Sequence, residues 1–296
     1  MQNNREQSPE NRRRNSVGEL YRKLKEYSET DYYPSHMPGH KRRLYGEMPP
    51  EIMNIDITEI DGFDNLHAPE EILKKLQEEA SALYGAEETF FLINGSTGGI
   101  LAAISAAVPK GGRIMMTRGA HKSAYHAVYL RNLTVSYLYP EMMEEYNIYD
   151  VVTPGQIAAA LESGPVPDAV FLVSPTYEGR IADIEAIAKI VHSKGIPLIV
   201  DEAHGAHLGL AEGLAKNSCQ CGADLVIHSV HKTLPALTQS ALLHVNGRLV
   251  NRDRLRRFLH IYQSSSPSYV LMAGIDNALL QVKEQGDYRF AHLQVN

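Results

Sequence analysis

The sequence has few cysteines, no long apolar run and no excess of positive charge. Cys219 and Cys221 are too few for a disulfide framework, so a reduced, cytoplasmic setting is expected. No window holds about 18 consecutive apolar residues, and the polar start of the chain lacks the features of a secretory signal, so we expect neither a membrane span nor export. With 29 basic against 35 acidic residues, the net charge of −6 argues against nucleic-acid binding and favours small-molecule chemistry.

The 296 residues suit one large α/β domain of ordinary composition. Residues 1–15 are polar, with three consecutive arginines, and are expected to form a solvated tail. A helical pattern begins at Pro69 and ends at Gly85, and from there short apolar runs alternate with helices. The expected strands are 89–93, 113–117, 134–139, 169–173, 197–200, 224–228 and 241–245; the expected helices between them are 100–108, 121–130, 154–161 and 182–193.

Strands that alternate with helices require crossover connections. We therefore expect an α/β fold with a mostly parallel seven-stranded sheet covered by helices on both faces. In such sheets ligands bind outside the carboxyl ends of the strands. This rule directs attention to the residues that follow each predicted strand.

A glycine-rich turn with two hydroxyls, Gly95-Ser96-Thr97-Gly98-Gly99, lies between the first strand and its helix. Free backbone N–H groups and the helix dipole at that point favour a phosphate group. The same residues would also suit a tight turn without any ligand. A P-loop is excluded because no Gly-Lys-Ser/Thr sequence occurs in the chain.

Asp201 follows another apolar run and opens the sequence Asp-Glu-Ala-His. Three interpretations compete. A helicase-type metal box needs a P-loop lysine, which is missing. A metal site built from Asp201, His204 and His207 has no settled ligand spacing. The third possibility is an acid that binds a protonated heterocycle through a charged hydrogen bond.

Lys232 follows the strand at 224–228, within Ser229-Val230-His231-Lys232-Thr233. Most lysines are solvated surface charges, but a lysine at the carboxyl end of a strand could form a Schiff base with an aldehyde cofactor. A phosphate cradle, a carboxylate for a pyridinium nitrogen and a lysine for an aldehyde are together the attachments that pyridoxal 5'-phosphate requires.

The sequence also resembles a known family, the pyridoxal-phosphate-dependent ornithine/lysine/arginine decarboxylases of the aspartate aminotransferase fold. The segments that carry the resemblance are His36 to Lys41 (HMPGHK), Asp56 to Asn65 (DITEIDGFDN), Asn94 to Gly98 (NGSTG), His121 to Ser123 (HKS), Asp201 to His207 (DEAHGAH), Ser229 to Thr233 (SVHKT) and Ser264 to Met272 (SSSPSYVLM). They extend through nearly the whole chain after residue 30.

The resemblance implies roles for individual residues. Lys232 would bind the cofactor aldehyde, and Asp201 would pair with the pyridine nitrogen. His121 would stack on the ring, and His204 would line the cofactor face or orient its hydroxyl group. The phosphate would be held by Gly95, Ser96, Thr97, Ser229 and His231. Without the family, His121 would be interpreted as a solvent-facing residue at a helix start.

The implied activity is decarboxylation of arginine, lysine or ornithine to an amine of polyamine metabolism, by a homodimer or higher oligomer. Subunit contacts are expected at 36–41 and 264–268. Residues 1–30 would form an N-terminal tail and helix, and 31–296 the cofactor-binding large domain. The small C-terminal domain usual in the family is expected to be absent, since the sequence ends at Asn296.

Two other functions remain open from the sequence. One is a pyridoxal-phosphate-dependent transferase of the same fold, although such enzymes have Ser-Lys rather than His-Lys-Thr around the lysine. The other is a truncated, non-catalytic dimerisation partner of a full-length enzyme. Candidate acids for recognising the basic side chain of a substrate are Asp61, Asp64 and Glu178.

Overall fold

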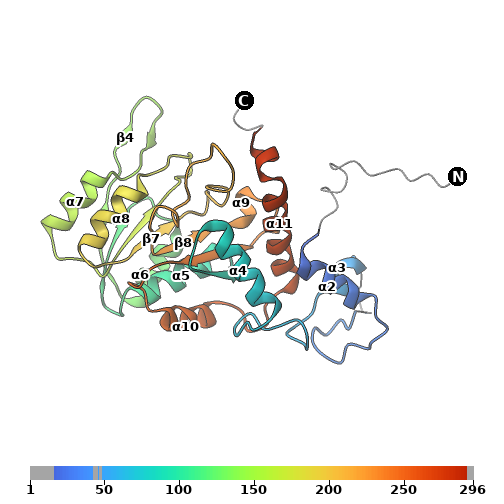
Figure 1. The fold of residues 1–296 in the computed structure, drawn as a ribbon. Coiled ribbons are helices and arrows are strands. Elements are labelled where there is room, and N and C mark those ends of the chain that lie inside the picture. Colours follow the sequence, from blue (N-terminus) through green and yellow to red (C-terminus); the bar gives the residue numbers. More distant parts are fainter. Residues whose placement is uncertain (1–16, 43–45, 47–48, 292–296) are drawn as a thin grey trace.

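A computed structural model describes residues 17–42, 46 and 49–291; the tail predicted at 1–15 lies outside these residues. A sheet of seven strands has the order β1-β9-β8-β7-β6-β2-β3 (Figure 1). The strands of this sheet are β1 (Glu88–Leu92), β2 (Arg113–Thr117), β3 (Thr134–Leu138), β6 (Ala169–Val173), β7 (Leu198–Asp201), β8 (Leu225–His228) and β9 (Ala241–Val245). The five strands from β8 to β3 pair in parallel, whereas β9 is antiparallel to both β1 and β8. The predicted mostly parallel seven-stranded sheet is confirmed.

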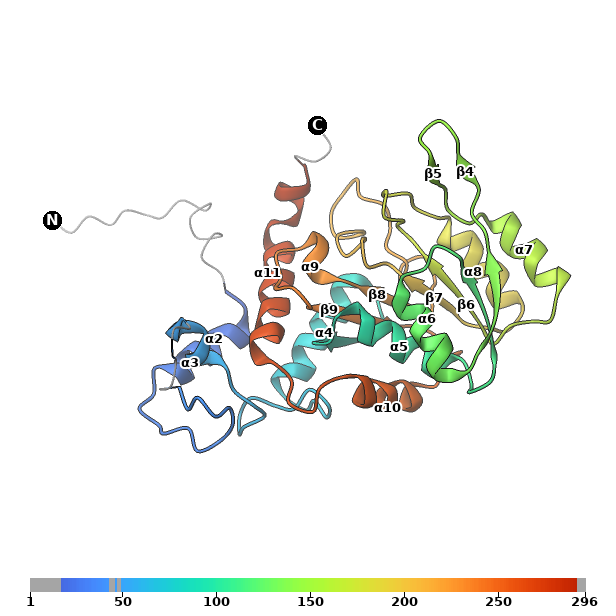
Figure 2. The same ribbon diagram turned by 180° about the vertical axis from the view of Figure 1, so that it is seen from behind.

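Helices cover both faces of this sheet (Figures 1 and 2). One face packs against α5 (Gly95–Ala107), α6 (Lys122–Arg131) and α10 (Arg252–Tyr262). The other face packs against α4 (Ile72–Tyr84), α7 (Pro154–Ser163), α8 (Ile184–Ser193) and α11 (Tyr269–Ala291). Alternating side chains of the central strands enter opposite cores; Ile199 faces α5, for example, and its neighbour Val200 faces α8.

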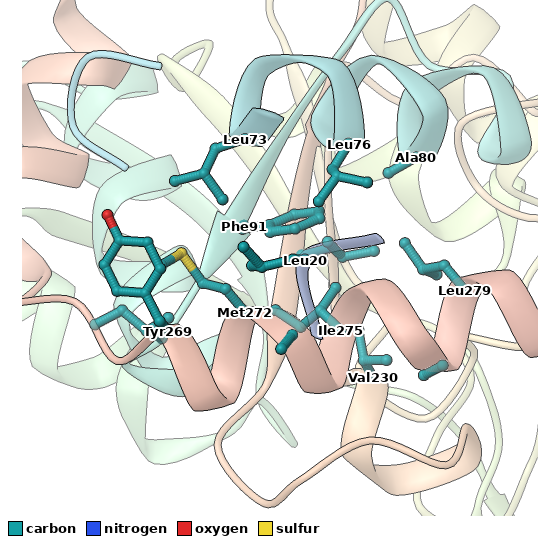
Figure 3. Packing of buried hydrophobic residues seen from close by; sticks show 14 of the residues in the cluster. Leu20, Leu73, Leu76, Ala80, Phe91, Val230, Tyr269, Met272, Ile275 and Leu279 are labelled. Atoms are coloured by element: carbon teal, nitrogen blue, oxygen red, sulfur yellow. The ribbon is translucent and has the colours of Figure 1, made fainter. Parts of the chain in front are cut away.

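The N-terminal helix α2 (Glu19–Ser28) belongs to the core of the domain. Leu20 and Leu24 are fully buried in a cluster that also contains Phe91 of β1 and Tyr269 of α11 (Figure 3). The carboxylate of Asp276 in α11 accepts the backbone N–H of Leu20 at 2.9 Å, which fixes the first turn of α2. This helix therefore packs as an integral element of the sheet's outer layer.

Several element boundaries differ from the predictions. Helix α4 begins at Ile72 rather than Pro69, and α8 begins at Ile184 rather than Ala182. The glycine-rich turn is itself the first turn of α5, which starts at Gly95. The apolar pattern does not predict α3 (Pro50–Ile55), the short helix α9 (Val230–Thr233), α10 or the small hairpin of β4 (Met142–Met143) and β5 (Ile148–Tyr149). Within the described part of the chain, no helix is long and apolar enough to cross a bilayer.

Candidate active site

The residues predicted to carry chemistry gather at the carboxyl ends of β1, β7 and β8. Asp201 is the last residue of β7, and Lys232 lies in the short helix α9 (Val230–Thr233) directly after β8. Because β7 and β8 are parallel neighbours, their ends bring these two side chains to the same edge of the sheet. The positive charge of Lys232 acts on the pKa values of Asp201, His121 and His204, so one amine serves as the centre of the group.

Asp201 is a buried acid, with only 4% of its surface exposed. Burial raises its pKa to about 6, although the backbone N–H of Ala203 and the charges of Lys232 and His228 act in the opposite direction. One carboxylate oxygen, Oδ1, accepts that N–H at 3.2 Å. A cationic partner would stabilise the charged form of this buried acid, because the partner offsets the cost of desolvating the carboxylate.

His204 touches the candidate lysine. Its Nε2 lies 3.0 Å from Lys232 Nζ, within hydrogen-bonding distance. Burial lowers the pKa of His204 and Lys232 lowers it further, while the charge of Glu178 raises it. A neutral imidazole at this point can accept a hydrogen bond from Lys232 Nζ, a contact that the resemblance did not anticipate.

His121 is the N-cap of α6, and its Nδ1 accepts the backbone N–H of Ser123 at 3.3 Å. Its side chain is exposed, as expected for a helix-start histidine, yet it also lies within the field of Lys232. Burial and the charges of Lys232 and Lys122 lower its pKa. The ring is therefore a neutral, accessible surface beside the lysine.

The first turn of α5 offers a cradle for an anion. Gly95 has a φ of +69°, a left-handed conformation that favours glycine, and a Cβ on Gly99 would lie 2.5 Å from Leu92 Cδ1. The side chain of Asn94 does not cap the helix; its Oδ1 accepts the N–H of Ser264 instead. Backbone N–H groups of this turn consequently remain available to a bound group.

Hydroxyl groups from the first turn of α5 and from the segment after β8 meet at the cradle. Ser229 Oγ donates to Ser96 Oγ at 2.9 Å, which joins the segment before Lys232 to the first turn of α5. Thr97 is exposed beside them. His231 Nδ1 hydrogen-bonds the carbonyl oxygen of Ser240 at 2.9 Å, an arrangement that requires the proton on Nδ1. Its second ring nitrogen is thereby an acceptor when the imidazole is neutral.

A buried polar chain behind the site was missed from the sequence. Glu202 Oε2 lies 3.6 Å from His228 Nε2, His228 Nδ1 lies 3.0 Å from His244 Nε2, and His244 Nδ1 lies 2.8 Å from Thr89 Oγ1. Burial holds the pKa of His244 well below its usual value. The sequence signal that could have revealed this chain is a histidine in each of two predicted apolar strands, 224–228 and 241–245. Glu202 thereby secures the segment between Asp201 and His204, since it also accepts the N–H of Ser218.

Asp64, a candidate for substrate recognition, has a structural role. Its carboxylate accepts backbone N–H groups of Asn65, Glu70, Glu71 and Leu73 at 2.8–3.0 Å, and so closes the start of α4. Burial alone would raise its pKa, but these four hydrogen bonds outweigh burial and lower it.

Asp64→Asn is expected to lower the free energy of unfolding by about 1–2 kcal/mol, the cost of losing a helix cap. Because the folded pKa is depressed, the carboxylate's contribution is present above pH ~4 and is lost as pH falls through the folded value. Urea unfolding at a series of pH values measures the difference, with Asp61→Asn, an exposed position, as the matched control. Equal stability of the two variants at pH 7 would contradict the capping role.

Comparison with known proteins identifies the family. Residues 18–295 match the family model described as Orn/Lys/Arg decarboxylase, major domain. The chain is 41% identical over 274 residues to the uncharacterized protein YaaO of Bacillus subtilis, covering 89% of this chain and 56% of the relative. It is 34% identical over 276 residues to an arginine decarboxylase of the same organism, covering 90% of this chain and 56% of that enzyme. The chain thus spans about half the length of these relatives.

Solved structures agree on the fold. The lysine decarboxylase LdcF of Francisella novicida superimposes with a TM-score of 0.83 at 20% identity, over 95% of this chain and 42% of that one. Lysine decarboxylase A of Pseudomonas aeruginosa superimposes with a TM-score of 0.80 at 22% identity, and the match covers 93% of this chain and 41% of that one. Together with the match over residues 18–295, these findings establish that the chain belongs to the Orn/Lys/Arg decarboxylase family and carries its major domain.

Proposed function

We propose that this chain holds pyridoxal 5'-phosphate and takes part in decarboxylation of a basic amino acid: arginine, lysine or ornithine. The observation that carries the proposal is the placement of Lys232, whose amine touches His204 and acts electrostatically on Asp201 and His121. Family membership supports the reaction class, and the names of the relatives support a basic substrate.

The residues present fit this cofactor. Asp201 is buried with a pKa raised to about 6, and it requires a cationic partner such as a protonated ring nitrogen. Gly95, Ser96 and Thr97 form the start of α5, where the side chain of Asn94 leaves the helix N–H groups uncapped, and Ser229 contacts Ser96 there. His231, two residues after Ser229, would complete the phosphate site. Lys232 would hold the aldehyde carbon, and His121 would cover the ring.

Each side chain would have a distinct task in the reaction. The bound cofactor supplies an electron sink for the pair released when carbon dioxide leaves the substrate. Asp201 keeps the ring nitrogen protonated, because its carboxylate would otherwise be buried without a counter-charge. His204 would orient Lys232 Nζ through their 3.0 Å contact. The same pair can return a proton to the substrate's α-carbon.

Two measurements test the proposal. Purified protein supplied with pyridoxal phosphate is expected to absorb visible light, and to release labelled carbon dioxide from at least one of arginine, lysine and ornithine. Mass spectrometry of the amine product identifies the substrate. Protein that stays colourless contradicts the cofactor assignment. Protein that absorbs visible light but releases no carbon dioxide from any of the three amino acids favours one of the two alternatives, a transferase of the same fold or a non-catalytic dimerisation partner.

The finer proposals concern assembly and organisation. The cofactor-binding large domain, expected over 31–296, would also include the packed helix α2, and the protein works as a homodimer in cytoplasmic polyamine metabolism. Segments 36–41 and 264–268 would contact the second copy; the first exposes Met37 (63%), and the second follows α10 and begins at the cradle through Ser264. Light scattering of the purified chain tests the dimer, and a monomeric mass would contradict it.

A further inference from the structure

The loop between β6 and α8 reaches the candidate active site. Its base is fixed on both sides: Ser174 Oγ accepts the N–H of Ala182 at 3.0 Å, and Arg180 forms a bidentate ion pair with Asp150 at 2.9 and 3.1 Å. Between these anchors, Thr176 N–H donates to the carbonyl oxygen of Arg180 at 2.9 Å, which makes a tight turn. These contacts hold the turn in place, and Tyr177 and Glu178 lie at its tip.

Tyr177 lies against the residue that touches the candidate lysine. Its ring centroid is 5.5 Å from that of His204 in an edge-to-face arrangement, and His204 Nε2 is 3.0 Å from Lys232 Nζ. Nevertheless 85% of Tyr177 is exposed, so most of its ring is uncovered. An exposed aromatic face next to a reactive amine is a surface that a cation can bind.

Glu178 supplies a negative charge at the same place. Its carboxylate is near enough to His204 to raise the pKa of that imidazole, against the effects of burial and of Lys232. Within the described part of the chain, its neighbour Arg180 pairs with Asp150 and no ion pair engages Glu178. The acid is therefore free to take a cation from outside the protein.

Elimination among the described acids favours Glu178. Asp64 is occupied by the start of α4, and Asp201 is buried where the cofactor nitrogen would lie. The charge of Glu178 raises the pKa of His204, and its chain neighbour Tyr177 contacts the same imidazole. Asp61 is exposed, and no contact joins it to the residues around Lys232 in the described part of the chain.

We propose that Tyr177 and Glu178 form the subsite for the cationic end of the substrate side chain: the carboxylate pairs with the guanidinium or ammonium group while the ring packs against it. The proposal rests on the proposed function, since it places the substrate's α-carbon at Lys232. A substrate held at that end extends its side chain past His204 toward the turn. Tyr177 and Glu178 are thus specificity-determining residues that take no part in bond breaking.

Charge-neutral variants provide the test. Glu178→Gln is expected to raise KM for the preferred basic amino acid about tenfold with kcat nearly unchanged, because an ion pair outside the reacting bonds contributes uniform binding. Glu178→Asp should recover part of the loss, and Tyr177→Leu should weaken binding several-fold. Glu162→Gln, an exposed carboxylate on α7 away from the site, is the matched control and should behave as wild type.

Binding to protein without pyridoxal phosphate, which cannot turn over these amino acids, separates this inference from the proposed function. Calorimetric titration compares lysine with norleucine and arginine with citrulline, pairs that differ chiefly in side-chain charge. Wild type should favour the charged member, and Glu178→Gln should lose that preference while it binds the neutral member equally well. An unchanged preference in Glu178→Gln, or no preference in wild type, overturns the subsite. If wild type prefers the charged amino acids but releases no carbon dioxide from them, the proposed reaction is wrong and the subsite still stands.

Discussion

Lys232→Ala protein supplied with pyridoxal phosphate is expected to lack the visible absorbance of wild type and to release carbon dioxide at least about 10³-fold more slowly, the scale of losing a reacting acid–base group. The reason is the position of Nζ, which lies 3.0 Å from His204 and within the field of Asp201. No other described side chain occupies the carboxyl end of β8 with a primary amine. Absorbance spectra and a labelled-substrate assay measure both effects.

A matched control and a fold check make the result decisive. Lys194→Ala changes an exposed lysine at the end of α8 and should keep full colour and activity. Because Lys232 is exposed, its replacement should leave the free energy of unfolding within about 0.5 kcal/mol of wild type. If folded Lys232→Ala protein keeps the full visible absorbance, Lys232 does not bind the cofactor and the proposed mechanism is wrong.

Asp201→Asn is expected to show opposite effects on catalysis and stability. The variant should still colour with the cofactor, through Lys232, but should release carbon dioxide about 10²–10³-fold more slowly, because an amide cannot hold the ring nitrogen protonated. In the absence of cofactor the same change should stabilise the protein at pH 7–8. Removing a buried charge relieves the desolvation cost that raises the pKa of Asp201 to about 6.

The sign of the stability effect follows from the raised pKa. The pKa of Asp201 is about 6 in the folded protein, against an ordinary value of 3.8. Its contribution to the free energy of unfolding is therefore fully present below pH ~4 and is lost as pH rises through 6. About two pKa units correspond to roughly 3 kcal/mol. Cofactor-free Asp201→Asn should therefore exceed wild type by up to that amount at pH 8 and match it near pH 4, as judged by denaturant unfolding.

Asp31→Asn, an exposed position near the start of the described chain, serves as the control and should show no pH-dependent difference. Addition of pyridoxal phosphate should stabilise wild type more than Asp201→Asn, because the carboxylate then gains its counter-charge. Equal stabilisation of the two proteins would argue that Asp201 does not meet the ring nitrogen.

Patterns of apolar residues predicted the sheet well, because its central strands β6, β7 and β8 are short apolar runs that are buried on both faces. Elements that the pattern analysis missed lack such a signal. Helix α10 carries four arginines in 11 residues and buries only Leu255 and Leu259, so its apolar stripe is narrow. The start of α4 was placed too early because its cap, Asp64, lies eight positions before Ile72, outside the usual capping distance.

The candidate site was predictable as a set of residues at strand ends, while its internal contacts were not. Parallel order alone places Asp201 beside the segment of Lys232. The contact between His204 and Lys232, and the hydroxyl pair of Ser96 and Ser229, depend on how separate loops fold back over the sheet edge. Glu178 could be proposed from its charge, but only the ring contact of Tyr177 with His204 locates its turn.

The pairing of β1 with β9 has a consequence for how the protein matures during synthesis. These strands lie about 150 residues apart in the chain, and among the described residues β9 is the sole strand that pairs with β1. A ribosome that adds about 5–20 residues per second completes β9 many seconds after β1 emerges. The first turn of α5, which follows β1, therefore cannot reach its final position until then. Cofactor capture is expected to be a late event, which chains interrupted before residue 245 do not reach.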